Sequence, residues 1–283
     1  MIYLKKISLL LAFTMILFCF TGCQSQENTS LKRERQKPKA ASVAFSSAIE
    51  ETEDGVNVVY LGVGVDKDGK ITYLSINRNE FKGDDTNVMS VKEQGESYGL
   101  CYEGYKGDWR DQMEAFEDYA IGKSMTIDQL LETELDENGV PVEDSDLFAA
   151  CEIDLHLAME ALESAKDKMH KMDTYSPVIS QYVYRTEDGF ELSIMLNTKD
   201  QYEKIKYVEI EQYDIIGHEA IRKNEEEIEK LEDGILGLTN YEVCHLETYD
   251  AGDGIHNSLP MENSFLGDIS INIGFLKEMY RKI

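Results

Sequence analysis

Aromatic side chains gather in one glycine-rich stretch and are the first candidates for ligand contact. Tyr98, Tyr102 and Trp109 lie close together in a segment that also carries many charges. Aromatic rings beside such a loop can stack on a flat ligand such as a flavin, a sugar or a peptide. Trp109 also begins an apolar helical face, so a place in the core is the favoured alternative for it.

A second set of side chains has the chemistry of a metal site. Cys244, His245 and His256 flank a loop that carries Asp250 and Asp253. Zinc and iron take such ligands, but the spacing matches no established pattern. The chain also shows no nucleophile elbow and no phosphate-cradling glycine loop. We therefore name no metal ligands and no catalytic residues, and a role without catalysis is favoured.

The N-terminus has the pattern of a secretory signal. Two lysines precede an apolar run from 7 to 20, which is shorter than the roughly 20 residues of a membrane-spanning helix. The run ends in Phe20-Thr21-Gly22-Cys23, and an ordinary signal with a chance cysteine is the alternative to a modified one.

These four residues resemble the lipobox of bacterial lipoproteins, although Phe20 stands where leucine is usual. The resemblance implies that residues 1–22 are removed and that Cys23 is lipidated. It places the mature chain at the cell membrane, lipid-anchored on the extracytoplasmic face.

Charge is distributed unevenly along the chain. The net charge is −27, and the leader carries two lysines and no acid, so the remainder carries about −29. Residues 23–49 are by contrast rich in Lys and Arg, polar and without hydrophobic period, which predicts a flexible linker attracted to anionic headgroups. The acidic remainder excludes nucleic acid as a partner, because nucleic acid needs a basic footprint.

Three cysteines remain beyond the leader and Cys23. They are Cys101, Cys151 and Cys244, and their number is odd and their spacing wide. This predicts mostly buried thiols, with one disulfide pair left open.

The first half of the chain contains a hairpin followed by helices. The segment 56–65 is almost continuously apolar, the turn Asp66-Lys67-Asp68-Gly69 follows it, and 71–76 alternates. Asp108 is a suitable N-cap for a helix whose apolar face begins at Trp109. A further amphipathic helix is expected over 154–169.

A similar order of strands followed by helices is expected after Asp173. Apolar side chains alternate with other side chains over residues 190–196, which predicts a half-buried strand. A third strand is expected over 205–210. Helices are expected over 218–232 and 269–283, with a strand over 244–248 between them.

Two short sequence segments of the first half have similar counterparts in the second half, at nearly the same distance along the chain. Residues 116–122 resemble 231–237, 115 positions later, and 153–157 resemble 269–273, 116 positions later. Chance similarity is the alternative to a repeat. We predict an α+β fold with two similar small domains, residues 50–170 and 174–283.

The first repeat resembles domains of secreted lipoproteins related to the FMN-binding domain. The resemblance covers most of 56–165, through Gly62-Val63-Gly64-Val65-Asp66, Gly95-Glu96-Ser97-Tyr98-Gly99-Leu100 and the helix from Trp109. The second repeat is similar to the FMN-binding domain in outline.

In that family, a threonine in the loop before the last helix accepts FMN through a phosphoester bond. The best match here runs from Glu247 through Thr248 to Asp253, and Asp253 stands at the acceptor position. A carboxylate has no hydroxyl to esterify and would repel the flavin phosphate. The resemblance therefore implies that any FMN is held non-covalently, with Thr248 and Asp253 as candidate ligand contacts.

The sequence thus predicts a lipid-anchored extracytoplasmic protein that binds a small ligand or an envelope partner without catalysis. The alternative is a non-covalent flavin carrier in cell-surface electron transfer, in which the cofactor supplies the redox chemistry.

Overall fold

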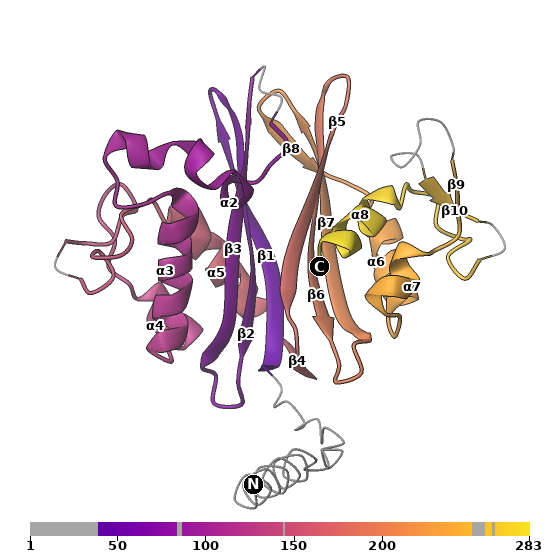
Figure 1. Cartoon of the computed structure of the whole chain (residues 1–283), viewed down its shortest axis with the longest axis horizontal. Helices are drawn as coiled ribbons and strands as arrows, with labels where there is room; N and C mark the ends of the chain where they lie inside the picture. The colour runs from indigo at the N-terminus through magenta and orange to yellow at the C-terminus, as the bar shows by residue number, and fades with distance from the viewer. Residues whose placement is uncertain (1–38, 84–86, 144, 251–257, 262–263) are drawn as a thin grey trace, which may run out of the picture. The chain divides into compact units, whose positions relative to one another are not determined.

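Two four-stranded antiparallel sheets, each covered by helices on one face, make up most of the described part of the chain (Figure 1). The computed structural model describes residues 39–83, 87–143, 145–250, 258–261 and 264–283, without the side chains of Cys101 and Tyr102. The predicted leader, Cys23, His256 and Asp253 lie outside these ranges. No helix within them has the length and apolarity needed to cross a bilayer.

The first sheet has the strand order β3-β2-β1-β4. Its strands are β1 (Ala40–Thr52), β2 (Gly55–Val65), β3 (Ile71–Lys82) and β4 (His170–Thr174). The predicted hairpin is confirmed as β2 and β3. Its turn is held by Asp66, whose Oδ1 accepts the backbone N–H groups of Asp68 and Lys70 at 2.9 Å.

Strand β1 corrects the linker expected over 23–49, because residues from Ala40 onward belong to the sheet. The strand is rich in alanine and serine, which have little β propensity, so its sequence resembles a linker. It is nevertheless a central strand with both edges paired. Val43 and Phe45 are buried on one face, and Ala44 and Ala48 on the other.

Helices cover one face of this sheet. They are α2 (Val91–Gln94), α3 (Trp109–Gly122), α4 (Ile127–Leu131) and α5 (His156–Asp167), with 3₁₀ turns η1 (Gly95–Tyr98) and η2 (Leu100–Glu103). Helix α3 lies on β3, and α5 lies on β1 and β2. The predicted N-cap is confirmed, since the side chain of Asp108 accepts the N–H of Asp111 at 2.9 Å.

The second sheet has the order β5-β6-β7-β8. Its strands are β5 (Val178–Arg185), β6 (Gly189–Lys199), β7 (Ile205–Ile216) and β8 (Glu219–Arg222). The expected strand over 190–196 lies in β6 but is buried on both faces, not one. Its even-numbered apolar residues face the first sheet, whereas Met195 faces the helices.

The segments after β7 correct three expectations. Residues 219–222 form β8, and the expected helix over 218–232 is instead α6 (Glu225–Ile235), which begins after Asn224 in the left-handed conformation. The strand expected over 244–248 is wrong, because α7 (Asn240–Cys244) ends there and β9 (Thr248–Asp250) follows, pairing with β10 (Ser258–Pro260). The last helix, α8 (Gly274–Lys282), begins five residues later than expected.

The two sheets pack face to face through a shared core. Phe45, Tyr60 and Phe81 meet Phe190 and Leu192 of the second sheet in this cluster. One further core, the first helix-side core, lies between the first sheet and its helices. Another, the second helix-side core, lies between the second sheet and its helices. The layer order is therefore helices, sheet, sheet, helices (Figure 1). The α+β fold with two small sheet-and-helix halves is confirmed, and residues 38–283 form one compact unit.

Both halves share the order of their main elements, although the short segments between these elements differ. Each has a three-stranded meander, a long helix, a short helix and a closing helix. The short helices begin in the same way, with a capping box of Thr126 and Gln129 in α4 and of Thr239 and Glu242 in α7. This shared order supports the repeat, and descent from a duplication stays a prediction.

Candidate functional site

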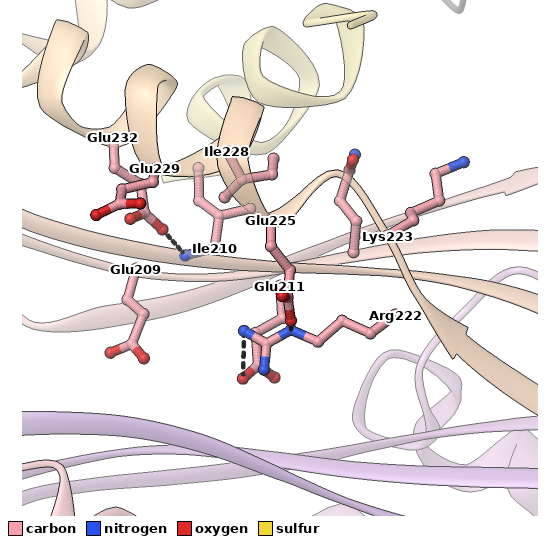
Figure 2. A pocket seen from close by; sticks show the side chains of 10 residues that line it. Glu209, Ile210, Glu211, Arg222, Lys223, Glu225, Ile228, Glu229 and Glu232 are labelled. Carbon is pink, nitrogen blue, oxygen red and sulfur yellow. Dashed lines mark hydrogen bonds and ion pairs between the residues drawn. The ribbon is translucent and has the colours of Figure 1, made fainter.

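A cleft of about 240 Å³ lies along the edge of β7, between β8 and α6 (Figure 2). Strand β8 pairs with β7 only from Tyr213 to Ile216, so the preceding part of β7, which is paired with β6 on its other side, has an open outer edge among the described strands. Glu232 of α6 satisfies one backbone donor on that edge, because its Oε1 accepts the N–H of Ile210 at 2.5 Å. Five glutamates, namely Glu209, Glu211, Glu225, Glu229 and Glu232, line this acid cleft with Arg222 and Lys223.

The two basic side chains of the acid cleft are engaged by carboxylates. Arg222 forms ion pairs with Glu211 at 3.5 Å and with Glu225 at 3.0 Å. Lys223 is bound to Glu191 and Asp214. Burial alone would lower the pKa of Lys223, but these hydrogen bonds raise it above its usual value. Both cationic side chains therefore neutralise carboxylates of the protein itself.

Glu211 connects the acid cleft to the first sheet. Its side chain is 2% exposed, and its Oε2 accepts hydrogen bonds from Ser47 of β1 at 2.6 Å and from Tyr213 at 3.0 Å. A buried carboxylate needs such partners to offset its desolvation. Glu211 thus joins the two sheets at this position.

Two further acids of the acid cleft, Glu209 and Glu232, are shifted toward the neutral form. Burial raises the pKa of Glu232 to about 8, and the charges of Glu209 and Asp233 add to the rise. Burial also raises the pKa of Glu209, whose carboxylate accepts the hydroxyl of Tyr207 at 2.5 Å. Glu232 is consequently protonated in much of the population at neutral pH.

A shifted carboxyl in a cleft is typical both of catalytic acids and of buried structural acids. A matching contact in the first half of the protein favours the structural interpretation. There, Glu117 of α3 accepts the N–H of Ile76 of β3 at 2.6 Å, as Glu232 accepts that of Ile210. An acid that satisfies an edge-strand N–H in both halves has a structural reason for its place. We therefore assign the acid cleft to the scaffold.

A larger cavity, of about 530 Å³, lies beside α7. We call it the α7 groove. Leu238, Leu246 and Leu266 provide its apolar lining. Tyr241 and Phe265 also line it and remain 71% and 63% exposed. Large aromatic side chains left this open to water, beside an apolar hollow, are typical of a surface that takes a ligand.

The capping box of α7 places these groups. Thr239 accepts the N–H of Glu242, and Glu242 accepts the N–H of Thr239 at 2.7 Å, so the helix begins at Asn240. Tyr241 then lies in the first turn and stacks on His245 one turn later, with ring centroids 4.0 Å apart. The backbone hydrogen bond from Thr239 lowers the pKa of Glu242, so this carboxylate is ionised at neutral pH.

The charges in the wall of the α7 groove are acidic. Glu242 and Glu247 line it, and none of the described lining residues is a lysine or an arginine. Lys277 lies near but is committed elsewhere, since its Nζ donates to the carbonyl of Leu246 at 2.6 Å and to Thr248 Oγ1 at 2.9 Å. Burial lowers the pKa of Lys277, with a contribution from Arg281.

Of the ligand residues expected from the sequence, the three whose side chains the structure describes do not share one site. Trp109 is 3% exposed and belongs to the first helix-side core. Tyr98 is half-buried against the same core, and its hydroxyl donates to Glu80 at 2.7 Å. Thr248 lies in the other half and accepts Lys277. The side chains of Tyr102 and Asp253 lie outside the described residues.

Two of the possible metal ligands, Cys244 and His245, have different surroundings. Cys244 is partly buried against the second helix-side core, whereas His245 is exposed and its Nδ1 lies 2.7 Å from the carbonyl of Tyr241. Within the described ranges, no three His, Cys, Asp or Glu side chains are arranged to hold a metal ion. Cys151 and Cys244 are free thiols.

Sequence reasoning missed Tyr241 and Phe265. One signal was available, because Thr239-Asn240-Tyr241-Glu242 is a capping-box sequence that predicts a helix start and puts Tyr241 on its first turn. Nothing in the sequence indicates that Phe265 lines the same cavity as Tyr241. Their proximity is a property of the fold.

Comparison with known protein families, curated proteins and solved structures yields no match.

Proposed function

We propose that this protein is a lipid-anchored extracytoplasmic binding protein whose α7 groove receives a small ligand without catalysis. The observation that carries the proposal is the exposure of Tyr241 and Phe265 over an apolar hollow of about 530 Å³. Cavities of roughly 300–1,000 Å³ with aromatic walls and few polar groups are the usual form of small-ligand sites. The lipobox resemblance at Cys23 supports the location.

The test is ligand-observed NMR on the full-length protein in nanodiscs of zwitterionic lipid, with indole as the aromatic probe and empty nanodiscs as the blank. Wild type and Tyr202→Ala should bind indole equally, because Tyr202 is 70% exposed but does not line the groove. Tyr241→Ala should lose most of the binding. Equal binding by all three proteins would contradict the proposal.

The second candidate is a flavin carrier that holds its cofactor non-covalently. Tyr241 and His245 form a stacked aromatic pair beside the hollow, and such rings can stack on the flat flavin system. The visible spectrum of the purified protein tests this candidate. A yellow protein that releases its colour on denaturation would favour it, whereas a colourless protein that takes up neither riboflavin nor FMN would exclude it.

A further inference from the structure

We propose that the α7 groove selects flat organic cations, meaning aromatic amines and quaternary ammonium compounds, over anions of the same shape. This inference rests on the proposed function and names the ligand class of the same groove. The aromatic faces, the carboxylates and the imidazole of the groove wall support it.

The aromatic faces of the groove suit a cation. Tyr241 and Phe265 are each more than half exposed, at 71% and 63%, and both line the same hollow. The face of an aromatic ring carries partial negative charge and attracts ammonium groups within about 6 Å of its centre. The apolar lining of Leu238, Leu246 and Leu266 receives the flat hydrocarbon part of such a ligand.

The fixed charges have the complementary sign. Glu242 is held in place by two bonds from Thr239 to its Oε2, at 2.7 and 2.9 Å, and Glu247 lies in the same wall. The nearby lysines are bound to backbone carbonyls, Lys277 to Leu246 and Lys204 to Gly237. A chain with a net charge of −27 adds a long-range field of the same sign.

His245 adds a directed acceptor. Its Nδ1 faces the carbonyl of Tyr241 at 2.7 Å, and a carbonyl only accepts, so Nδ1 carries the hydrogen. In the neutral ring, Nε2 then keeps its lone pair and can accept an N–H from an ammonium group. An anionic ligand, such as one with a phosphate or carboxylate, meets no lysine or arginine among the described lining residues, and only the neutral hydroxyls of Tyr241 and Ser264 can donate to it there.

The test compares tryptamine with indole-3-propionate, which share the indole ring and chain length and differ in the sign of the terminal charge. Both are titrated into the full-length protein in zwitterionic nanodiscs, and binding is counted only where Tyr241→Ala removes it and Tyr202→Ala does not. We expect tryptamine to bind about tenfold more tightly, given a net preference of roughly 1.4 kcal/mol. The preference should shrink as the salt concentration rises.

Glu242→Gln is the charge variant of choice, because glutamine at this position preserves the capping box while it removes the charge. This variant should keep the binding of indole and lose several-fold of the preference for tryptamine. Equal binding of both probes, or tighter binding of indole-3-propionate, overturns the cation inference and leaves the proposed function intact. If neither probe nor indole binds in a Tyr241-dependent way, the proposed function itself fails.

Discussion

Glu117 and Glu232 make the same contact in the two halves of this protein, each through its Oε1 to a backbone N–H of the third strand of its meander. The N···O distances are 2.6 Å to Ile76 and 2.5 Å to Ile210. Their surroundings differ, because Lys92 lies 2.7 Å from Glu117 while the charges around Glu232 are mostly acidic. The same backbone requirement is thus met by a carboxyl paired with a lysine in one half and by a carboxyl among acidic neighbours in the other, and burial raises the pKa of both.

Glu232 should make the stability of the protein fall as the pH rises through neutrality. The folded state keeps the proton up to about pH 8, whereas the unfolded chain releases it near 4.5. Unfolding between these pH values releases a proton, so it becomes more favourable as the pH rises, by at most about 1.4 kcal/mol per pH unit. Glu232→Gln should therefore gain stability relative to wild type from pH 6 to pH 8, measured by urea unfolding with circular dichroism.

The control for this prediction is Glu226→Gln, on the same helix but outside the cleft, with a side chain that is 85% exposed and a charge that is not among those raising the pKa of Glu232. Its stability relative to wild type should not change across that range. A stability difference for Glu232→Gln that is the same at pH 6 and pH 8 would show that Glu232 does not titrate as described.

Lys92→Met should destabilise the protein by about 2–4 kcal/mol at pH 8, because it leaves the buried carboxylate of Glu117 without its counter-ion. The loss should be smaller at pH 5.5, where Glu117 can take up a proton. Burial already raises the pKa of Glu117 despite the opposing effect of Lys92. Urea unfolding followed by the fluorescence of Trp109, the single tryptophan, measures the change.

The double variant Lys92→Met with Glu117→Gln checks the cause. Glutamine keeps an oxygen for the N–H of Ile76 and carries no charge, so the double variant should be more stable than Lys92→Met alone. If the double variant is the less stable of the two, the ion pair is not the source of the loss.

Gly62→Ala should cost roughly 1–3 kcal/mol, because the sheets approach closely at this glycine. A Cβ at position 62 would lie 2.8 Å from Ile179 Cγ2 and 2.9 Å from Leu196 Cδ1, both in the opposite sheet. Gly122→Ala is the matched control, since a Cβ there meets nothing within 4 Å and alanine favours the helix. Thermal unfolding of both variants tests the sheet-to-sheet contact, and similar melting temperatures would argue against it.

Cys23→Ala should abolish lipidation and release the protein from the membrane fraction, because no other lipid attachment is expected. Cys19→Ala, inside the apolar run, should leave lipidation unchanged. Radiolabelled palmitate incorporation and membrane fractionation measure both outcomes. A Cys23→Ala protein that stays lipidated or membrane-bound would falsify the lipobox assignment.

The elements that could be predicted from the sequence are those with local signals. Helix α3 has its N-cap at Asp108 and an apolar period, and the turn at Asp66 is held by its own side chain. Strand β8 could not be predicted, because residues 219–222 are largely exposed and are a strand only through pairing with β7. The candidate site was missed for a similar reason, since Tyr241 and Phe265 come together only in the folded chain.

The sequence by itself determined the α+β composition, the order of most strands and helices, and the expectation of a lipid anchor at Cys23, because caps, turns, periodicity and signal patterns act over a few residues. The tertiary structure alone decided that the two sheets share a core, that β1 is a central strand, and that Tyr98 and Trp109 pack on a core while Tyr241 and Phe265 of the α7 groove face water. The reason is physical: burial and pairing depend on neighbours that are distant in sequence.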